Sequence, residues 1–438
     1  MRPRARRISW GTKKVGRVAT GFSCYTSQMK VFTSILLGVF LLIQVPSVQA
    51  STNERDLRLQ IEAIKGYLQY QQGSTNTLST EDMRLIILGS ENWIVAAQEE
   101  SGHFGYEYIP LEDRYLRDDN MIRQAGTLFA LSEVYKHKED KDAATGKAIE
   151  KAISYFESLS VKGEKADGDF WCIKNSERSN TCSLGSVSLA LIGILNYVEA
   201  QPEKEAKYEK IIDKYLDYLL AAKFAGAGFS GSYRVGVGFG NKESAFYNGE
   251  AMLALVRYYQ YRPDEQVKRV LNETFIYLSA KETFESPLYL WIMAALKDMQ
   301  KLWPNEAYAT YASEFTAIRL SEASARHRNQ GNYCAPVEGL TSAYSVLKNY
   351  ESVDYLARLN SEIEFWLART SYLQISEENP YRLMIEDGQP QLKKIPNLSI
   401  AQGGFLTASA VSTQRIDFTQ HCVSAYLQKL IDIDGQEL

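Results

Sequence analysis

The densest group of residues capable of chemistry lies in the segment RIDFTQHCVSA, residues 415–425. Asp417 and His421 are four residues apart, so a helix would place them on one face, where a carboxylate can orient an imidazole. His421 is therefore a candidate general base, and Arg415 is a candidate for holding a substrate carboxylate through two parallel hydrogen bonds. The set predicts a lyase or an epimerase acting on a uronate. The competing interpretation is an N-cap aspartate beside a structural histidine.

Two other carboxylates form a candidate pair for glycoside hydrolysis, which needs one acid and one base or nucleophile across the scissile bond. Glu250 lies in the apolar run NGEAMLAL, whose side chains would raise its pKa and favour a general acid. Asp119, in RDDN, is the predicted second member. Structural alternatives exist for both: Asp119 as a helix N-cap and Glu250 as the partner of an arginine in the core.

Aromatic and basic residues accompany these groups along the chain. A sugar ring stacks on an aromatic face through its C–H groups and uses its hydroxyls for hydrogen bonds. The residues predicted to bind substrate are Arg123, Trp171, Tyr233, Tyr247, Trp291, Tyr333 and Arg415.

A repeat determines how these residues are positioned. Six short loops, usually with glycine next to an aromatic residue, each lead into a run rich in Ala, Gly and Ser. Their starts are separated by roughly 45 to 75 residues, a period typical of repeat architectures. The loops are GHFGY (102–106), GDFW (168–171), GAGFSG (226–231), ESPLYLW (285–291), GNYC (331–334) and GGF (403–405).

Amphipathic stretches with a charged face lie between these runs and predict outer helices. They cover residues 81–99, 143–159, 203–223, 264–281, 305–323 and 353–375. The runs with small residues and no charged face predict buried inner helices. Strand signals are limited to short pieces such as YRVGVGF (233–239). The pattern predicts an all-α fold, an (α/α)6 toroid of six helical hairpins with an extra N-terminal helix.

The expected organisation has three parts. Residues 1–50 are predicted to be a signal peptide with an extended basic n-region, residues 51–80 an N-terminal helix and linker, and residues 81–438 the toroid. The longest irregular segment, 376–413, is a candidate lid or binding loop.

This repeat resembles the six-hairpin glycosidase-like superfamily, which includes glycoside hydrolases, unsaturated-glycuronyl hydrolases, polysaccharide lyases and sugar epimerases. The resemblance implies that the six loops and the N-termini of the inner helices meet at one end and form a funnel. It also implies a carbohydrate-active enzyme with a saccharide or other small polar substrate. A non-catalytic saccharide- or peptide-binding toroid is the alternative.

The repeat is also similar to that of the wider α-toroid group, in which lanthionine-synthetase cyclases hold zinc with a cysteine from hairpin five and a Cys-His pair from hairpin six. Cys334, His421 and Cys422 would be the counterparts here. The dipeptide order is reversed and the flanking glycine is missing, so a disulfide or two free thiols is favoured over zinc. No metal ion or cofactor is predicted.

Export is predicted from the segment 29–50, which has a lysine, an apolar stretch and a small-residue end at Ala50. An uncleaved membrane anchor is the alternative. Beyond this segment Cys172, Cys182, Cys334 and Cys422 remain, an even number suited to an oxidising compartment. Cys172 and Cys182 flank a short loop and are expected to form a disulfide.

The net charge of −4 argues against a nucleic-acid partner, which would require a basic face. After cleavage of the signal no membrane association is expected. The sequence makes no prediction of the oligomeric state.

Overall fold

The computed structural model describes residues 54–72, 77–165, 168–281, 284–326, 331–386, 389–409 and 411–438. The signal-peptide and membrane-anchor predictions concern residues outside these ranges. Contacts divide the chain into two units, and the large one consists of Glu54–Leu383 and Leu392–Leu438. The helices and the sites described below belong to this large unit, and residues 384–391 belong to the other one. Within the described ranges, no helix is long and apolar enough to cross a bilayer.

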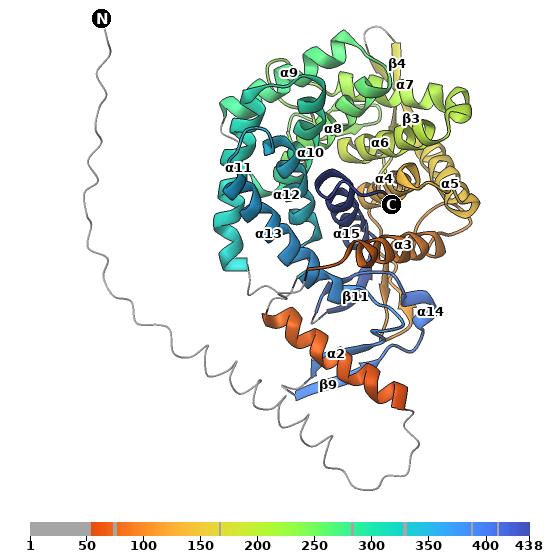
Figure 1. Cartoon of the computed structure of the whole chain (residues 1–438). Helices are drawn as coiled ribbons and strands as arrows, with labels where there is room; N and C mark the ends of the chain where they lie inside the picture. The colour runs from red at the N-terminus through yellow and green to blue at the C-terminus, as the bar shows by residue number, and fades with distance from the viewer. Residues whose placement is uncertain are drawn as a thin grey trace, which may run out of the picture. The chain divides into compact units, whose positions relative to one another are not determined.

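Six helices form a closed inner ring (Figure 1). Each contacts the next one along the chain, and the last contacts the first. They are α4 (Met121–His137), α6 (Leu184–Ala200), α8 (Ala245–Tyr261), α10 (Ser286–Leu302), α12 (Cys334–Leu347) and α15 (Ile416–Gln428). In α6 every residue from Leu184 to Val198 is buried, as expected for a helix that is apolar on all sides.

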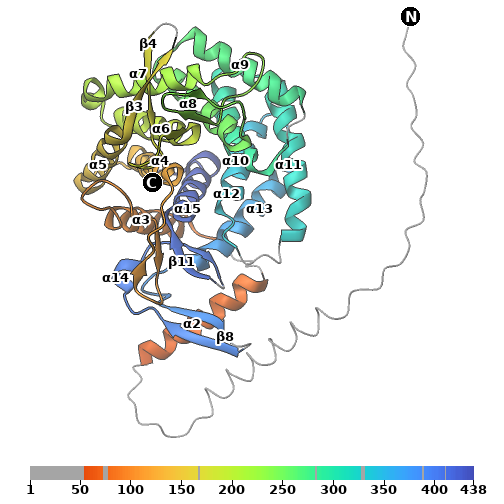
Figure 2. The same ribbon diagram turned by 180° about the vertical axis from the view of Figure 1, so that it is seen from behind.

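A second set of helices surrounds this ring, which is also visible from behind (Figure 2). They are α3 (Thr80–Ala96), α5 (Ala143–Leu159), α7 (Glu205–Ala221), α9 (Glu265–Ala280), α11 (Glu306–Arg326) and α13 (Val353–Thr370). Each buries one stripe; in α7 the stripe includes Ile211, Tyr215 and Leu219, spaced by four residues. With α2 (Glu54–Gln72) ahead of them, the helices confirm the predicted (α/α)6 toroid with its extra N-terminal helix.

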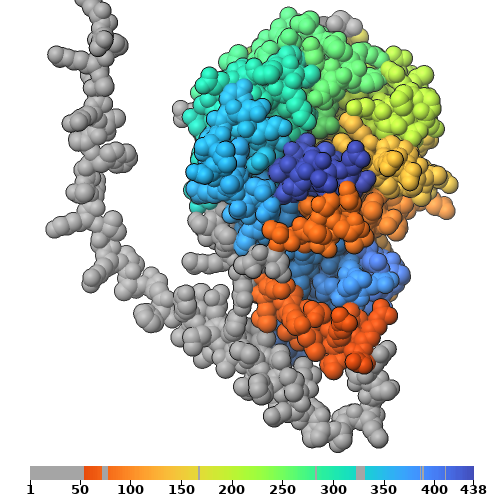
Figure 3. Space-filling model, in the orientation of Figure 1, coloured from red at the N-terminus to blue at the C-terminus, as the bar shows by residue number. Residues whose placement is uncertain are grey.

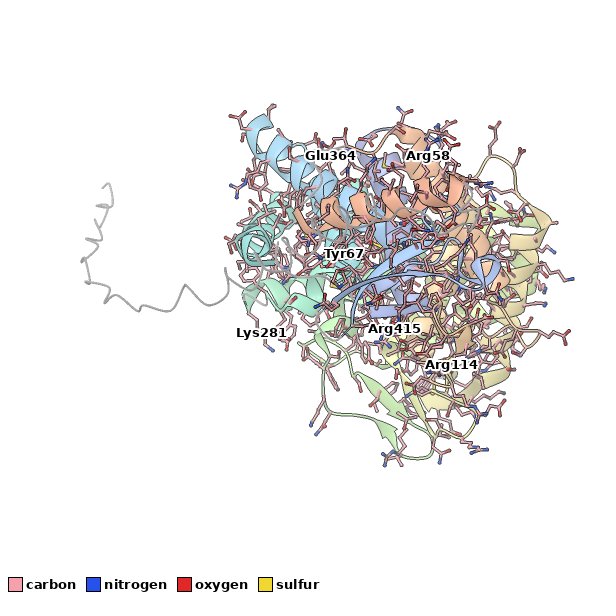
Figure 4. The ribbon with its side chains drawn as sticks, turned by 90° about the horizontal axis from the view of Figure 1, so that it is seen from below. Arg58, Tyr67, Arg114, Lys281, Glu364 and Arg415 are labelled. Atoms are coloured by element: carbon pink, nitrogen blue, oxygen red, sulfur yellow. A yellow bond between two sulfur atoms is a disulfide. The ribbon has the colours of Figure 1, made fainter. Side chains whose placement is uncertain are left out.

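The segment 376–413 is more ordered than the sequence pattern predicted. It contains β8 (Tyr381–Glu386), β9 (Gln389–Lys394), α14 (Leu398–Ala401), β10 (Leu406–Ala408) and the start of β11 (Val411–Arg415). β10 and β11 join β1 (Glu107–Ile109) and β2 (Arg114–Tyr115) in a sheet of order β10-β11-β1-β2. Arg114 and Arg415, on this sheet, are labelled in Figure 4. These strands are short and pair across the chain, so local periodicity carried little sign of them.

Hairpins two and three carry the other small sheets. β3 (Ser160–Lys165) pairs with β4 (Gly168–Ile173), and β5 (Thr181–Ser183), β6 (Ser232–Arg234) and β7 (Gly238–Phe239) form a three-stranded sheet.

Two disulfides cross-link the large unit. Cys172–Cys182 joins β4 to β5, as the sequence predicted. Cys334–Cys422 joins α12 to α15, with a Cα–Cα distance of 4.7 Å. Both sulfurs of this second pair are therefore bonded to each other and are not available as thiolate ligands, which removes the zinc arrangement proposed from the cyclase resemblance.

Candidate active site

A cavity of about 270 Å³, called here the front cavity, lies at the end of the ring where the inner helices begin. It is lined by Asn120, Ile122, Arg123, Leu189, Phe246, Tyr247, Glu250, Trp291, Asp417, Gln420 and His421. Six of the residues singled out in the sequence are among them: Arg123, Tyr247, Glu250, Trp291, Asp417 and His421. The predicted funnel therefore exists and gathers side chains from α4, α6, α8, α10 and α15.

Glu250 is the most unusual group in the front cavity. Its side chain is buried, with 2% exposure, and its Oε2 atom makes no hydrogen bond with any described residue. Burial raises the pKa of Glu250 to about 8. Room for the carboxyl comes from Gly185 on the neighbouring helix α6, where a Cβ atom would lie 2.2 Å from Oε2. At neutral pH the group is therefore mostly protonated and can donate a proton.

His421 is held by a carboxylate from a different helix than the one expected. Its Nδ1 atom lies 2.8 Å from Oε2 of Glu338 on α12, which is almost fully buried. Burial raises the pKa of Glu338, and the hydrogen bond with His421 opposes this effect. When Nδ1 donates its proton to Glu338, Nε2 is left as the basic atom of the ring.

Asp417, the predicted partner of His421, is instead enclosed by arginines. Arg415 reaches both of its oxygens, with Nε and Nη2 at 2.6 and 2.9 Å. Arg123 contributes a third contact, from Nε at 2.9 Å. Asp417 therefore binds two guanidinium groups. Arg415 already makes its bidentate hydrogen bonds to this protein carboxylate.

Aromatic side chains form the walls of the cavity. Trp291 lies beside the imidazole of His421, with ring centroids 5.9 Å apart. Tyr247 lies one turn before Glu250 on α8, and Phe246 next to it is 49% exposed. These faces suit stacking against an apolar face of a ligand.

Five of the predicted site residues do not line the front cavity. Asp119 interacts with His103 at 3.2 Å and accepts a hydrogen bond from Gln124, while the N-cap of α4 is Asn120. Burial opposes ionisation of Asp119, but these two partners lower its pKa. Asp119 is therefore a satisfied structural carboxylate, not the partner of Glu250 across the cavity.

The other four have structural surroundings of their own. Trp171 stacks under the ammonium group of Lys210, and Tyr333 stacks on Trp366 at 4.1 Å. Tyr233 packs edge-on against Phe170. Arg415 borders the cavity only through its partner Asp417.

Glu338 is the functional candidate that spacing could not identify as the partner of His421, because 83 positions separate the two residues. One signal was available. Glu338 and Glu250 are both acidic residues within otherwise apolar inner helices, each in the second turn. Such residues are almost never fully buried without a reason.

A second cavity, called here the rear cavity, has the same volume of about 270 Å³ and lies where the inner helices end. Lys297 contacts Asp432 at 2.7 Å and Lys136 contacts Glu199 at 2.6 Å. Arg257 is paired with both Asp298 and Glu133. The charged groups of the rear cavity therefore form a layer of ion pairs. The C-terminal segment that contributes to this layer is dark blue in Figure 3, at the centre of the face shown.

No protein-family model matches the sequence, and no curated protein matches it at a significant level. Solved structures match it in fold. A family 76 α-mannanase from Bacteroides thetaiotaomicron aligns with a TM-score of 0.55 and 10% identity, over 81% of this chain and 96% of its own. A sugar epimerase from a ruminal bacterium gives 0.56 and 10%, over 82% and 100%. For a cellobiose 2-epimerase from Spirochaeta thermophila the values are 0.52 and 11%, over 80% and 96%.

These likenesses define the fold: the chain is a six-hairpin (α/α)6 toroid, and the resemblance predicted from the repeat is confirmed at that level. The three proteins compared are named for action on sugars.

Proposed function

We propose that this protein is an exported carbohydrate-active enzyme that moves protons with Glu250 as the acid and His421 as the base. The observation that carries the proposal is that a buried carboxyl without a partner and a carboxylate-bound imidazole line one cavity with aromatic walls. Perturbed ionisable groups that share a pocket are typical of catalytic sites. The folds similar to this one belong to proteins named for sugar chemistry, which favours a saccharide substrate.

An epimerase or lyase is favoured over a hydrolase. Hydrolysis needs a second carboxylate that acts as nucleophile or base, but Asp119 lies outside the front cavity and Asp417 is bound by two arginines. Proton abstraction needs only a base on one side and an acid on the other. His421 Nε2 would take a proton from a carbon next to a carbonyl or carboxylate. Glu250 would give one to the opposite face or to a leaving oxygen.

The test is a product assay in D2O with a panel of neutral and acidic oligosaccharides. We expect deuterium incorporation into recovered sugar for an epimerase, or ultraviolet absorbance of an unsaturated product for a lyase. New reducing ends without either signal would indicate hydrolysis instead. Binding of saccharides with no product of any kind would show a non-catalytic toroid.

Variants test the assignment of the base. His421→Ala and Glu338→Gln are expected to lower turnover by about 100-fold and 10-fold, since general base catalysis contributes about 10²–10⁴. The matched control is His103→Ala, which removes another carboxylate-bound histidine that does not line the cavity. Turnover that survives His421→Ala, or that falls equally in His103→Ala, would contradict the role of His421.

A further inference from the structure

The arginines around Asp417 leave a positive charge in the front cavity. Two guanidinium groups, from Arg123 and Arg415, share one carboxylate. Arg415 uses Nε and Nη2 on it, whereas Arg123 uses Nε alone. The two terminal nitrogens of Arg123 make no hydrogen bond or ion pair with any described residue. The four N–H groups on these two nitrogens are therefore unused by the described residues, and Arg123 is the member that lines the cavity.

The surroundings do not neutralise this charge. Asn120 and Gln420, which also line the cavity, are uncharged, and the Arg123 guanidinium lies over the ring of Tyr106, which carries no formal charge. Burial lowers the pKa of Arg123, and nearby Arg415 adds to this while Asp417 opposes it. That pattern is the electrostatic consequence of two cations held by one anion. The remaining acid of the cavity, Glu250, is buried without a partner and mostly protonated at neutral pH, because burial raises its pKa to about 8.

The N-termini of the inner helices also favour an anion in the front cavity. Arg123 lies in the first turn of α4 and Asp417 in the first turn of α15. The N-caps of α8 and α15 make no side-chain hydrogen bond, whereas α4 is capped by Asn120, which accepts from the backbone N–H groups of Ile122 and Arg123. Free backbone N–H groups and the helix dipole favour an anion at this end.

We infer that Arg123 binds the carboxylate of an acidic sugar, so that the substrates are saccharides containing a uronate or a similar carboxylated unit. Arg415 then serves as the support that holds Asp417, and through it Arg123, in place. The sequence predicted that Arg415 binds the substrate carboxylate, but in the structure Arg415 already donates its bidentate hydrogen bonds to Asp417. That these saccharides are turned over rests on the proposed function, whereas the binding of their carboxylate by Arg123 does not depend on it.

This arrangement links binding to the proposed chemistry. In a uronate the carbon next to the carboxylate carries the proton to be removed. The C–H bond breaks, the proton goes to His421 Nε2, and the electron pair moves into the carboxylate, whose added charge Arg123 stabilises. For an epimerase, the electron pair returns to the same carbon and forms a new C–H bond with a proton from Glu250 on the opposite face. For a lyase, the electron pair forms a C=C bond to the neighbouring carbon, the bond from that carbon to the leaving oxygen breaks, and Glu250 protonates this oxygen. One proton is taken and one is given, so no further reactant is required.

The test uses matched sugars that differ only in the C6 group, such as cellobiose and cellobiouronic acid, with equivalent pairs in manno and galacto configuration. Affinity is measured by calorimetry and by intrinsic tryptophan fluorescence, and turnover by the D2O assay. Wild type should bind the acidic member of at least one pair about 10-fold or more tightly, as expected for a charge-assisted pair. Arg123→Gln should weaken binding of the acidic member by about 10- to 100-fold and remove the preference.

Two further variants sharpen the result. Arg123→Lys keeps the charge but loses the planar fork, so it should recover only part of the preference. Arg262→Gln, at the C-cap of α8 in an exposed ion-pair cluster with α7, is the control and should retain the full preference. Equal binding of both members of every pair, tighter binding of neutral sugars or sugar phosphates, or an acidic preference that persists in Arg123→Gln would overturn the inference.

The failure of the proposed function is distinguishable from these outcomes. If acidic sugars bind wild type, lose affinity in Arg123→Gln and yet are never converted, the anion site stands and catalysis is refuted. If neutral sugars are converted with no acidic preference, catalysis stands and the anion site is refuted.

Discussion

The front and rear cavities have the same volume and share the same inner helices, but they differ in how their charges are paired. At the rear, the buried carboxylate of Asp432 is paired with cations. Burial would raise the pKa of Asp432, yet Lys297, Lys301 and Arg257 lower it to about 2. At the front, Glu250 has no such partner and burial alone raises its pKa to about 8. The pKa values of two carboxyls on one scaffold are thus shifted in opposite directions, one by burial and the other by its cationic partners.

The difference reflects what each end of the ring must do. The inner helices end at the rear, where their carbonyl dipoles are negative, and Lys136, Lys297 and Lys301 lie there to offset them. The ion pairs cost desolvation but are complete, so the rear end contributes to the integrity of the ring. The front end leaves a buried acid without a partner and a guanidinium that uses only its Nε atom on a carboxylate. Groups left in this state are reactive and destabilising at once.

The largest expected effect separates the two cavities by turnover. Glu250→Gln keeps the shape of the side chain but cannot donate an acidic proton, so kcat should fall by about 10²–10⁴-fold. Glu199→Gln removes a carboxylate from the rear cavity and should leave kcat within about twofold, since nothing at the front depends on it. The kcat values of both variants are measured by steady-state kinetics on a substrate identified by the D2O assay. Equal losses in the two variants would erase the functional distinction between the cavities.

Next in size is the cost of breaking a rear ion pair. Asp432→Asn leaves Lys297, which is only 5% exposed, without its closest partner. We expect a loss of about 3–5 kcal/mol in the free energy of unfolding, measured by urea titration. The double variant Lys297→Met/Asp432→Leu removes both charges and should recover most of that loss. A single variant as stable as wild type would show that the rear layer is not a stabilising element.

The Glu250 carboxyl of the front cavity should make the free energy of unfolding depend on pH. The folded-state pKa of Glu250 is about 8, above an unfolded value of about 4.3. The folded protein therefore binds more protons between these values, and its stability falls as pH rises through that window and levels off above about 8. Glu250→Gln lacks this loss, so its stability relative to wild type should rise by about 3–4 kcal/mol from pH 5 to pH 8. Parallel curves from denaturant unfolding at pH 5, 7 and 9 would rule out a buried unpaired carboxyl.

The smallest effect concerns the rim of the rear layer. Lys301 also faces Asp432, at 3.7 Å, but its side chain is 57% exposed. Solvent screening should limit the loss in Lys301→Ala to about 0–1 kcal/mol. Comparison with Asp432→Asn in the same urea assay shows whether burial decides the strength of these pairs. A loss as large as that of Asp432→Asn would mean that exposure is the wrong criterion.

The helices could be predicted closely from the sequence, because their pattern is local. The outer helix expected at 143–159 coincides with α5, and that expected at 264–281 differs from α9 by one residue at each end. The short strands could not, because β1 and β11 pair residues about 300 positions apart, such as Glu107 with Arg415. Pairing between such distant segments leaves no periodic trace.

The same reasoning explains the outcome for the site. The repeat placed Glu250 and His421 at one end because each lies near the start of an inner helix. It could not rank the polar residues within the loops, so Asp119, Trp171, Tyr233 and Tyr333 were included although they have partners elsewhere. Spacing along one helix suggested Asp417 for His421, whereas the actual partner Glu338 comes from the adjacent helix. Neighbours around a ring are set by helix packing, which single-helix spacing does not describe.

The closure of the ring between α4 and α15 has a consequence for how the site comes into being. Arg123 on the first inner helix meets Asp417 on the last, and Thr127 meets Gln420 across 293 positions of sequence. The front cavity therefore lacks the wall formed by α15 until that helix has packed against α4. Contacts this distant in sequence slow folding. A chain in which only the first five hairpins are folded would hold Glu250 and Glu338 but neither His421 nor Asp417, so the cavity is completed in one step when the ring closes.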